Sequence, residues 1–253
     1  MTQSSHIVTG LHPVKELLEN APETVEAIFL QKGGRQQKPI IEICHGLGIR
    51  FQTLPRAQLD KLSTAQHQGI AARVFHPGFL EPETLLATLG KAPLPLVLAL
   101  DQVQDPGNIG ALARTLYALG GAGLVLPKNK SAPLGSGAFK ASAGALNYLP
   151  VAQVTNVGRF LETATDQGIL VVGSGATPEA LPLYTAQLTT PAILVLGNEH
   201  KGMRPGVAKK CASVVSIPLQ RTFDSLNVAQ AGAILISEFL RQQNAKASRD
   251  PLL

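Results

Sequence analysis

The sequence has no tryptophan and few aromatic side chains of any kind. Its 253 residues include 3 tyrosines and 8 phenylalanines, so aromatic residues make up 4% of the chain. Proteins that bind single-stranded nucleic acid without sequence preference stack the bases on aromatic rings, and so low a content argues against a platform of that kind. Hydrophobic residues nevertheless reach 45% and charged residues 15%, which is the composition of an ordinary globular protein.

Cysteine is equally scarce. The two cysteines, Cys44 and Cys211, show neither CxxC spacing nor a pattern of histidine partners. Metal sites and disulfide frameworks both leave such patterns in a sequence. We therefore expect no metal, and we interpret both cysteines as reduced residues of the core.

Long apolar runs are absent as well. No segment approaches the roughly 18 apolar residues of a membrane-spanning helix, and residues 1–6 lack the basic and apolar regions of a signal peptide. We expect a cytoplasmic protein with no membrane partner. A formal net charge of +5 and a pI near 9.3 favour a nucleic-acid partner only modestly, because many proteins that bind none are as basic.

The apolar pattern divides the chain into a small and a large part. Residues 1–75 alternate predicted helices and strands: a helix over 11–18, a strand over 26–31, a helix over 40–47, and strands over 49–54 and 69–75. Residues 76–94 are rich in proline, glycine and charge, which predicts a linker with a short helix inside it. The large domain then spans 95–243, and 244–253 has the composition of a polar tail.

The predicted strands of the large domain are almost wholly apolar and cover 96–100, 123–126, 168–172, 192–196 and 213–217. Continuous apolar runs are typical of strands buried on both faces, and hence of a parallel sheet with helices on each side. The helices are expected over 109–119, 138–147, 157–167 and 226–242. The sequence therefore predicts an α/β fold.

Two polar segments, 105–110 and 223–227, each follow an apolar strand and precede a helix. Open α/β sheets build their sites at the carboxyl ends of their strands, so both segments can meet there. By local pattern alone, we expect Asn108 and Ser225 to cap the helices that follow them. Arg114 points away from the apolar stripe of its helix, and an isolated arginine in such a place is typically a solvent-exposed charge.

A third polar segment extends a strand through Gly197, Asn198, Glu199 and His200 to Gly202. Glycines let a backbone approach a ligand closely, and the acid could bind a hydroxyl group or a cation of that ligand. The simpler alternative is a connection with a solvated Glu199, and we take His200 as solvent-facing. No dinucleotide fingerprint, P-loop or GxSxG motif is present, which argues against a dinucleotide site and against Ser225 as a nucleophile.

In combination and order, these segments closely resemble the three motifs of the SpoU family of RNA 2′-O-ribose methyltransferases. The motifs are DPGNIGALAR at 105–114, LGNEHKGM at 196–203, and IPL at 217–219 with SLNV at 225–228. GLHPVKELL at 10–18 and HQGIAA at 67–72 resemble the RNA-binding N-terminal domain of the 23S rRNA guanosine-2′-O-methyltransferase subgroup. Only the tail and part of the linker fall outside the resemblance.

The resemblance implies a parallel α/β sheet with a C-terminal trefoil knot, preceded by a small α/β RNA-binding domain. It also implies S-adenosylmethionine as cofactor and a homodimer that packs knot against knot, with sites built from residues of both chains. By match of position, the residues expected to surround the cofactor are Gly173, Ser174, Gly175, Ala176, Thr177, Leu196, Gly197, Asn198, Ile217, Leu219 and Leu226.

The implied reaction is attack of a ribose 2′-oxygen on the sulfonium methyl group, and the expected catalytic residues are Asn108, Arg114, Glu199, Ser225 and Asn227. A guanidinium group stays protonated in proteins and resists deprotonation. We therefore expect Arg114 to bind the adjacent phosphate and stabilise the developing alkoxide. The amides and Ser225 would hold loops and substrate, and Glu199 would anchor the site or accept the proton.

Three functions remain open on the sequence alone. They are a large-subunit rRNA guanosine methyltransferase, a 2′-O-methyltransferase of tRNA or of rRNA in antibiotic resistance, and a non-catalytic RNA-binding or ribosome-assembly protein. The N-terminal domain favours rRNA, with Lys32, Arg35, Lys38 and Arg73 as candidate RNA contacts. The intact catalytic set disfavours a scaffold. Departures from the usual pattern at Gly135, Ala229 and Gln230 concern the target nucleotide more than the chemistry.

Overall fold

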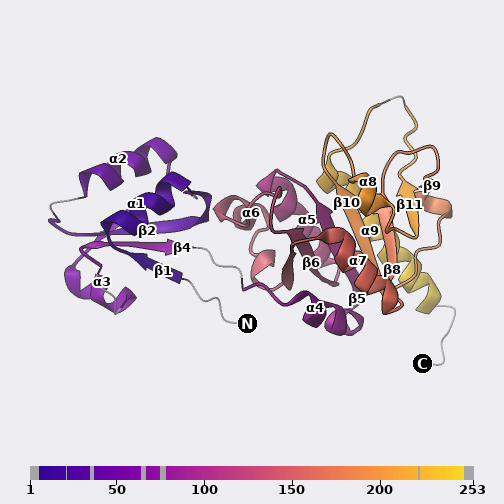
Figure 1. Cartoon of the computed structure of the whole chain (residues 1–253), viewed down its shortest axis with the longest axis horizontal. Helices are drawn as coiled ribbons and strands as arrows, with labels where there is room; N and C mark the ends of the chain where they lie inside the picture. Colours follow the sequence, from indigo (N-terminus) through magenta and orange to yellow (C-terminus); the bar gives the residue numbers. More distant parts are fainter. Residues whose placement is uncertain are drawn as a thin grey trace. The chain divides into compact units, whose positions relative to one another are not determined.

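The structure, a computed structural model, describes residues 6–20, 22–34, 37–63, 67–74, 78–221 and 223–247. The chain divides into two units (Figure 1): an N-terminal unit of residues 1–78 with 133–137, and a C-terminal unit of residues 79–132 with 138–253. Each unit is described by itself below.

The N-terminal unit is built on a mixed four-stranded sheet of order β1-β4-β2-β3. Strands β2 and β3 are parallel, whereas β4 runs antiparallel to both β1 and β2. Its elements are β1 (His6–Thr9), α1 (Leu11–Asn20), η1 (Pro22–Thr24), β2 (Val25–Gln31), α2 (Lys38–Leu47), β3 (Phe51–Leu54), α3 (Arg56–Leu62) and β4 (Ile70–Val74).

The core of the N-terminal unit has two parts. Val14, Ile28 and Ile40, from α1, β2 and α2, belong to the larger cluster, while Leu59 of α3 packs with Phe29 in a smaller one. The sequence did not predict β1 or α3, both of which are short: β1 has 4 residues and α3 has 7. Elements of this length carry too few repeats for an apolar period to stand out.

The C-terminal unit contains a seven-stranded sheet of order β7-β6-β5-β10-β8-β11-β9. Every neighbouring pair is parallel, which confirms the parallel sheet predicted from the apolar runs. The strands are β5 (Leu94–Asp101), β6 (Gly121–Pro127), β7 (Val151–Val154), β8 (Leu170–Ser174), β9 (Leu181–Pro182), β10 (Ala192–Gly197) and β11 (Ser213–Ser216). Only β7 and β9 were not predicted.

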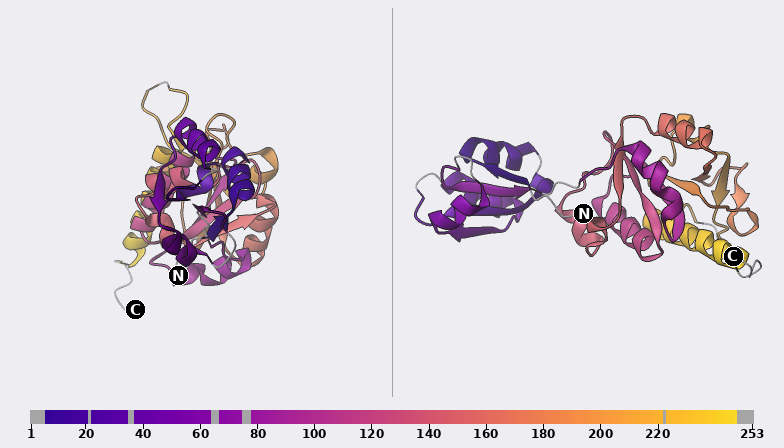
Figure 2. Two further views of the ribbon diagram at one scale, coloured as in Figure 1. Left: turned by 90° about the vertical axis from the view of Figure 1, so that its left-hand side faces the viewer. Right: turned by 90° about the horizontal axis from the view of Figure 1, so that it is seen from below.

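Both faces of this sheet are buried, because successive side chains of a strand point to opposite faces. In β5 and β10, Val97, Ala99, Ile193 and Val195 share a core with α4, α7 and α8. The alternate leucines of the same strands are equally buried on the other face, where α9 lies so close that a Cβ on Gly232 would be 2.9 Å from Leu196 Cδ1. The right-hand panel of Figure 2 shows α7 on one side of the sheet and α9, in yellow, on the other.

Three of the four helices predicted for the large domain, those over 109–119, 157–167 and 226–242, are found near these positions, whereas the short helix over 205–208 was not predicted. The helices of the C-terminal unit are α4 (Pro82–Thr88), η2 (Leu89–Lys91), α5 (Pro106–Ala118), α6 (Ser136–Ala141), η3 (Ala145–Asn147), α7 (Val157–Asp166), η4 (Leu183–Thr185), α8 (Pro205–Ala208) and α9 (Val228–Ala247). The helix expected over 138–147 is broken because Ala143 and Gly144 have φ values of 48° and 88°. A left-handed pair cannot continue the helical hydrogen bonds.

The segment expected to be a linker, 76–94, contains a short helix as anticipated, but from Phe79 onward it belongs to the C-terminal unit. Leu85 and Leu86 of α4 and Leu89 of η2 are buried in the same core as Val125 and Val154. Pro82 begins α4 instead of interrupting it, because a proline at the first helical position needs no N–H partner. In the part of the chain that the structure describes, no helix could span a membrane.

Candidate active site

The carboxyl ends of the parallel strands meet at one edge of the C-terminal sheet, as in other open α/β folds. Strand β8 lies between β10 and β11 in that sheet. The segments expected to bind the cofactor, 173–177, 196–198 and 217–219, leave the ends of these three neighbouring strands. Segments far apart in the sequence are thus placed side by side at one edge.

A chain of hydrogen bonds joins residues from all three motifs. Asn108 Nδ2 donates to Glu199 Oε1 at 3.1 Å, and Asn227 Nδ2 donates to Asn108 Oδ1 at 3.0 Å. Asn108 is only 9% exposed, so its amide would be costly to leave without partners. We call Asn108, Glu199 and Asn227 the polar cluster. It contains three of the five residues expected to be catalytic.

The expected cap of α5 was wrong. Asp105, not Asn108, precedes the helix, and its Oδ1 accepts a hydrogen bond from Gly107 N at 2.7 Å. Pro106 occupies the first helical position, where proline is favoured, and this places the cap one residue earlier. Asn108 therefore lies in the first turn of α5, and its side chain is free to bond Glu199 and Asn227.

The expected cap of α9 was also wrong. Asn227 Oδ1 accepts hydrogen bonds from Ala229 N at 2.8 Å and from Gln230 N at 3.4 Å, directly before the helix that begins at Val228. Asn227 therefore holds the start of α9 with its oxygen and Asn108 with its nitrogen. Ser225 is exposed and, within the described residues, has no hydrogen bond to the polar cluster.

Asn198 fixes the 198–204 loop, which carries Glu199. Its backbone exchanges two hydrogen bonds with Gly202, at 3.0 and 2.9 Å, and its Oδ1 accepts from the backbone of His200 and Lys201. Its Nδ2 donates to Gln102 O at 2.9 Å and to Glu199 Oε2 at 3.4 Å. Asn198, expected to contact the cofactor, thus also holds Glu199 in place. His200 is exposed, as the sequence predicted.

Gly197, at the end of β10, has no room for a side chain where the 198–204 loop crosses it. A Cβ on Gly197 would lie 2.2 Å from both Gly202 C and Met203 N, which are backbone atoms that cannot swing aside. A Cβ on Gly173 would lie 2.5 Å from Met203 Cε. Gly197 therefore allows the backbone to pass close to itself, whereas Gly173 lies against a methionine side chain that could move.

An ion pair that the sequence analysis did not identify anchors the end of the same loop. Asp101 is fully buried at the end of β5, and its Oδ1 accepts from Arg204 Nε at 2.8 Å and lies 2.6 Å from the terminal nitrogen Nη2. Arg204 N also donates to Asp101 Oδ2 at 2.8 Å. The sequence does contain a signal for this ion pair, namely an acidic residue at the end of an otherwise apolar strand. A carboxylate buried there needs a cationic or hydrogen-bonding partner.

Cys211 lies near the same ion pair but has no sign of reactivity. Burial, and secondarily the negative charge of Asp101, raises the pKa of its thiol to about 11. The side chain is therefore neutral at physiological pH, whereas the thiolate is the nucleophile and the metal ligand. Cys44 is buried, and burial raises its thiol pKa as well. Among the described residues, no group of histidine, cysteine and acidic side chains could hold a metal ion.

Arg114 is not part of the polar cluster. It lies nearly two turns beyond Asn108 on α5, about 9 Å along the axis at 1.5 Å per residue. Its side chain is exposed, and no acidic residue of the described chain forms an ion pair with it. The structure thus brings together Asn108, Glu199 and Asn227, and leaves Arg114 as a free cation on the helix surface.

The residues at the strand ends suit S-adenosylmethionine. Ser174 and Gly175 are only partly covered, and Ala176 and Thr177 are exposed at the end of β8. Leu219 follows the neighbouring strand β11, and its side chain, which is 42% exposed, offers an apolar surface. Small-molecule sites combine apolar side chains with a few polar groups, backbone N–H and C=O groups among them, and these segments offer both.

In the N-terminal unit, His67 of the 67–72 motif makes its contacts within the unit. Buried His67 accepts from Gly69 N through Nδ1 at 2.9 Å, and its Nε2 lies 2.7 Å from Asp60 Oδ1. Arg73 lies 5.0 Å from the centre of the Phe29 ring. Of the other expected RNA contacts, Lys32 and Lys38 are exposed. Arg35 lies outside the described residues.

Comparison with known proteins decides the family. Residues 95–237 match the SpoU rRNA methylase family, and residues 7–79 match the substrate-binding domain of RNA 2′-O ribose methyltransferases. The chain belongs to the SpoU family. It is 36% identical to the 23S rRNA (guanosine-2′-O-)-methyltransferase RlmB of Vibrio parahaemolyticus, over 96% of this chain and 99% of that protein. It is 35% identical to the RlmB of Yersinia pestis, over 96% and 100%.

Solved structures agree with this assignment. The TrmH/SpoU tRNA modifying enzyme of A. aeolicus is 26% identical and has a TM-score of 0.57, and the match covers 66% of this chain and 84% of that chain. The SpoU methyltransferase AviRb of Streptomyces viridochromogenes, in complex with AdoMet, shares the fold at 22% identity, with a TM-score of 0.60 over 96% and 92% of the chains.

SpoU membership confirms the expected fold class, an α/β domain with a C-terminal trefoil knot that follows a small substrate-binding domain. The protein is an RNA 2′-O-ribose methyltransferase with S-adenosylmethionine as cofactor and RNA as substrate, as the resemblance of the motifs implied. A purely structural RNA-binding role is thereby set aside. The polar cluster joins the three motifs on which the resemblance was first recognised.

Proposed function

We propose that this SpoU enzyme methylates the 2′-oxygen of a guanosine in 23S rRNA, in the cytoplasm. The observation that carries the proposal is the polar cluster, which ties the three motifs together at the carboxyl edge of the sheet. The target is supported by the RlmB relatives, whose names specify a 23S rRNA guanosine and which match over nearly their whole length. A. aeolicus TrmH, by contrast, covers only 66% of this chain.

The cofactor site proposed here lies across the ends of β8, β10 and β11. It is formed by residues 173–177, 196–198, Ile217, Leu219 and Leu226, largely through backbone groups. S-adenosylmethionine supplies the electrophilic methyl group. The protein must position the ribose and promote removal of a proton from a weakly acidic hydroxyl group.

Glu199 is the proposed proton acceptor. Amide donors from Asn108 and Asn198 each point at one of its carboxylate oxygens, at 3.1 and 3.4 Å. An ionised carboxylate offers about four lone-pair positions, so capacity remains for a bond from the 2′-hydroxyl. Asn227 acts through Asn108, and Ser225, exposed before α9, is positioned to contact substrate.

Arg114 requires a second chain in this proposal. An exposed cation about 9 Å along α5 from Asn108 is too far along the helix to join its own cluster. We therefore propose a homodimer through the knot domain, in which Arg114 of each chain serves the site of its partner. There it binds the phosphate next to the target and stabilises the developing alkoxide.

The proposal is tested by transfer of labelled methyl from S-adenosylmethionine to protein-free 23S rRNA, 16S rRNA, bulk tRNA and precursor particles of the large subunit, followed by mapping of 2′-O-methyl sites. Label at one 23S guanosine, on naked RNA or in precursor particles, is the expected result. Label confined to tRNA or 16S rRNA would overturn the substrate. No label on any of the four, with cofactor binding intact, would contradict the proposed activity.

A further inference from the structure

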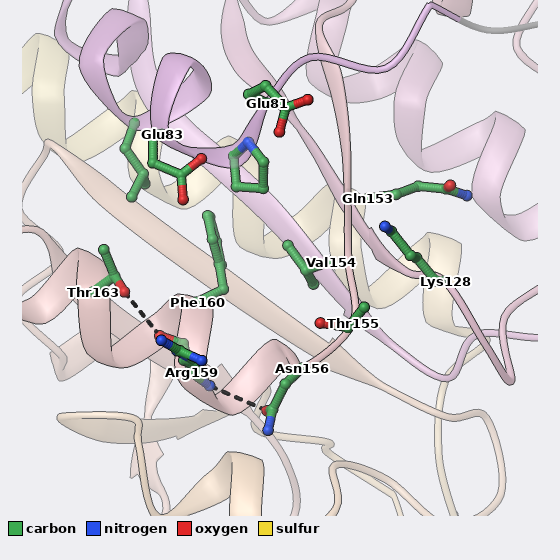
Figure 3. A pocket seen from close by; sticks show the side chains of 12 residues that line it. Glu81, Glu83, Lys128, Gln153, Val154, Thr155, Asn156, Arg159, Phe160 and Thr163 are labelled. Carbon is green, nitrogen blue, oxygen red and sulfur yellow. Dashed lines mark hydrogen bonds between the residues drawn. The ribbon is translucent and has the colours of Figure 1, made fainter.

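A groove outside the polar cluster lies in the C-terminal unit, between α4, the ends of β6 and β7, and α7 (Figure 3). It has a volume of about 380 Å³. A second hollow of about 390 Å³, between α7 and α8, shares Asn156 and Arg159 with it. We call the first the α4–α7 groove. It is lined by Glu81, Pro82, Glu83, Leu86, Lys128, Gln153, Val154, Thr155, Asn156, Arg159, Phe160 and Thr163.

The charges of this groove are separated onto different walls. Figure 3 shows Glu81 and Glu83 on the α4 side, Lys128 on the side of β6, and Arg159 on α7. Among the described residues, none of these four side chains belongs to an ion pair. Neighbouring cations are already engaged, since Arg204 pairs with Asp101 and Lys210 with Glu162.

The floor of the groove is apolar. Leu86, Val154 and Phe160 are each at least 94% buried but still line the hollow, and Gln153, Thr155 and Thr163 add polar groups around them. An apolar floor with a few polar and charged groups, in a volume within about 300–1,000 Å³, is typical of a site for a small ligand or for one unit of a polymer.

Resting on the proposed function, we propose that the α4–α7 groove binds one nucleotide of the RNA substrate outside the methylated position. Lys128 and Arg159, on different walls, bind the phosphates on the two sides of this nucleotide, as these residue types do in most contacts with the nucleic-acid backbone. Glu81 and Glu83 accept hydrogen bonds from N–H groups on the edge of its base, because a carboxylate pairs with such donors. The base lies on the apolar floor.

The position of the groove fits a strand that also reaches the polar cluster. In the sheet order, β7 is three strands from β10, which is about 14 Å at the usual strand spacing. The adjoining hollow includes Arg204, which lies in the same loop as Glu199. Lys128 and Asn156 follow the carboxyl ends of β6 and β7. Groove and cluster therefore open on the same edge, and a single-stranded segment can follow that edge.

The test compares the double variant Lys128→Gln/Arg159→Gln with the control Lys91→Gln. Lys91 is an exposed cation of the same unit, but it precedes β5 and so lies at the opposite edge of the sheet. We expect the double variant to raise the KM for 23S rRNA about tenfold and to reduce the slope of log Kd against log salt by about one to two. The kcat and the KM for S-adenosylmethionine should not change.

An RNA affinity and salt slope equal to those of Lys91→Gln would overturn the proposal. RNA binding measured directly keeps this test separate from the proposed activity, because an enzyme that methylates no RNA contradicts the activity alone.

A second arm uses Glu81→Gln/Glu83→Gln, which should weaken RNA binding. Tighter binding would show that the carboxylates only repel phosphate. Binding of free nucleoside monophosphates, with RNA affinity unchanged in the double variant, would assign the groove to free nucleotides instead.

Discussion

Asn227 donates a hydrogen bond of 3.0 Å to Asn108, a residue 119 positions earlier in the chain. The bond links the first turn of α5 to the residue before α9. Because Asn108 in turn donates to Glu199, the position of the carboxylate depends on both asparagines. Loss of either amide should therefore affect the same step of catalysis.

Asn108→Ala should lower kcat about 10²-fold and leave the KM for S-adenosylmethionine nearly unchanged. The substitution removes the donor to Glu199 Oε1 and the acceptor for Asn227 Nδ2, and misplacement of a reacting group by about 1 Å has an effect of that size. Steady-state kinetics with saturating RNA measures both constants. A variant with normal kcat would show that the polar cluster is structural only.

Arg114→Ala should abolish methyl transfer while cofactor binding, measured by calorimetry, persists. Mixed dimers then test whether Arg114 acts across the dimer. Co-expression of Arg114→Ala and Asn227→Ala chains gives about half heterodimers, each with one intact composite site, so about a quarter of wild-type activity should return. Recovery of no activity would place Arg114 in the site of its own chain.

Gly197→Ala should destabilise the protein by roughly 2 kcal/mol or more and remove cofactor binding. Its Cβ would lie 2.2 Å from backbone atoms of Gly202 and Met203, so the 198–204 loop must move. Gly206→Ala is the matched control, since no atom lies within 4 Å of a Cβ there and alanine favours the helix. Urea unfolding gives the stability difference. Equal urea midpoints for Gly197→Ala and Gly206→Ala would contradict the close approach of the 198–204 loop to Gly197.

Cys211 should make the stability of the fold depend on alkaline pH. Its thiol pKa rises from 9.0 to about 11 on folding, so the folded state favours the protonated form. The resulting stabilisation is fully present below pH 9 and is lost as the pH rises toward 11. The Cys211→Ala variant lacks this thiol. Between pH 8.5 and 11 its free energy of unfolding should therefore fall by about 2 kcal/mol less than that of the wild type. Parallel loss in both proteins would contradict the shift.

The strands of the C-terminal unit could be predicted because burial on both faces leaves a signal in every residue. Leu96, Val97 and Leu98 belong to alternate faces and all are fully buried. Strand β7 lacks this signal because Gln153 interrupts it, and β9 contains only two residues. A run of that length cannot be distinguished from a turn.

The helix caps show how local rules compete. Asp105 and Asn108 both suit the N-terminus of a helix, and Pro106 between them decides in favour of Asp105. That signal was present in the sequence. The partners of Asn108 were not, because Glu199 and Asn227 approach it only once the sheet has formed. A residue with a long-range role thus looked like an ordinary cap.

The motifs identified the residues of the site but not their arrangement. Asn198 was expected to contact the cofactor, and the structure adds that it holds the loop of Glu199 through four hydrogen bonds of its side chain. The ion pair of Asp101 with Arg204 joins residues 103 positions apart. No periodicity of the sequence specifies such a pair, because it depends on which strands become neighbours.

The N-terminal and C-terminal units bury separate sets of apolar side chains, the first around Val14 and Ile28 and the second around Val97 and Leu161. Cooperative unfolding extends as far as a shared core does, so we expect each unit to melt as a block of its own. A calorimetric trace should then be the sum of two transitions, which no single melting temperature would describe.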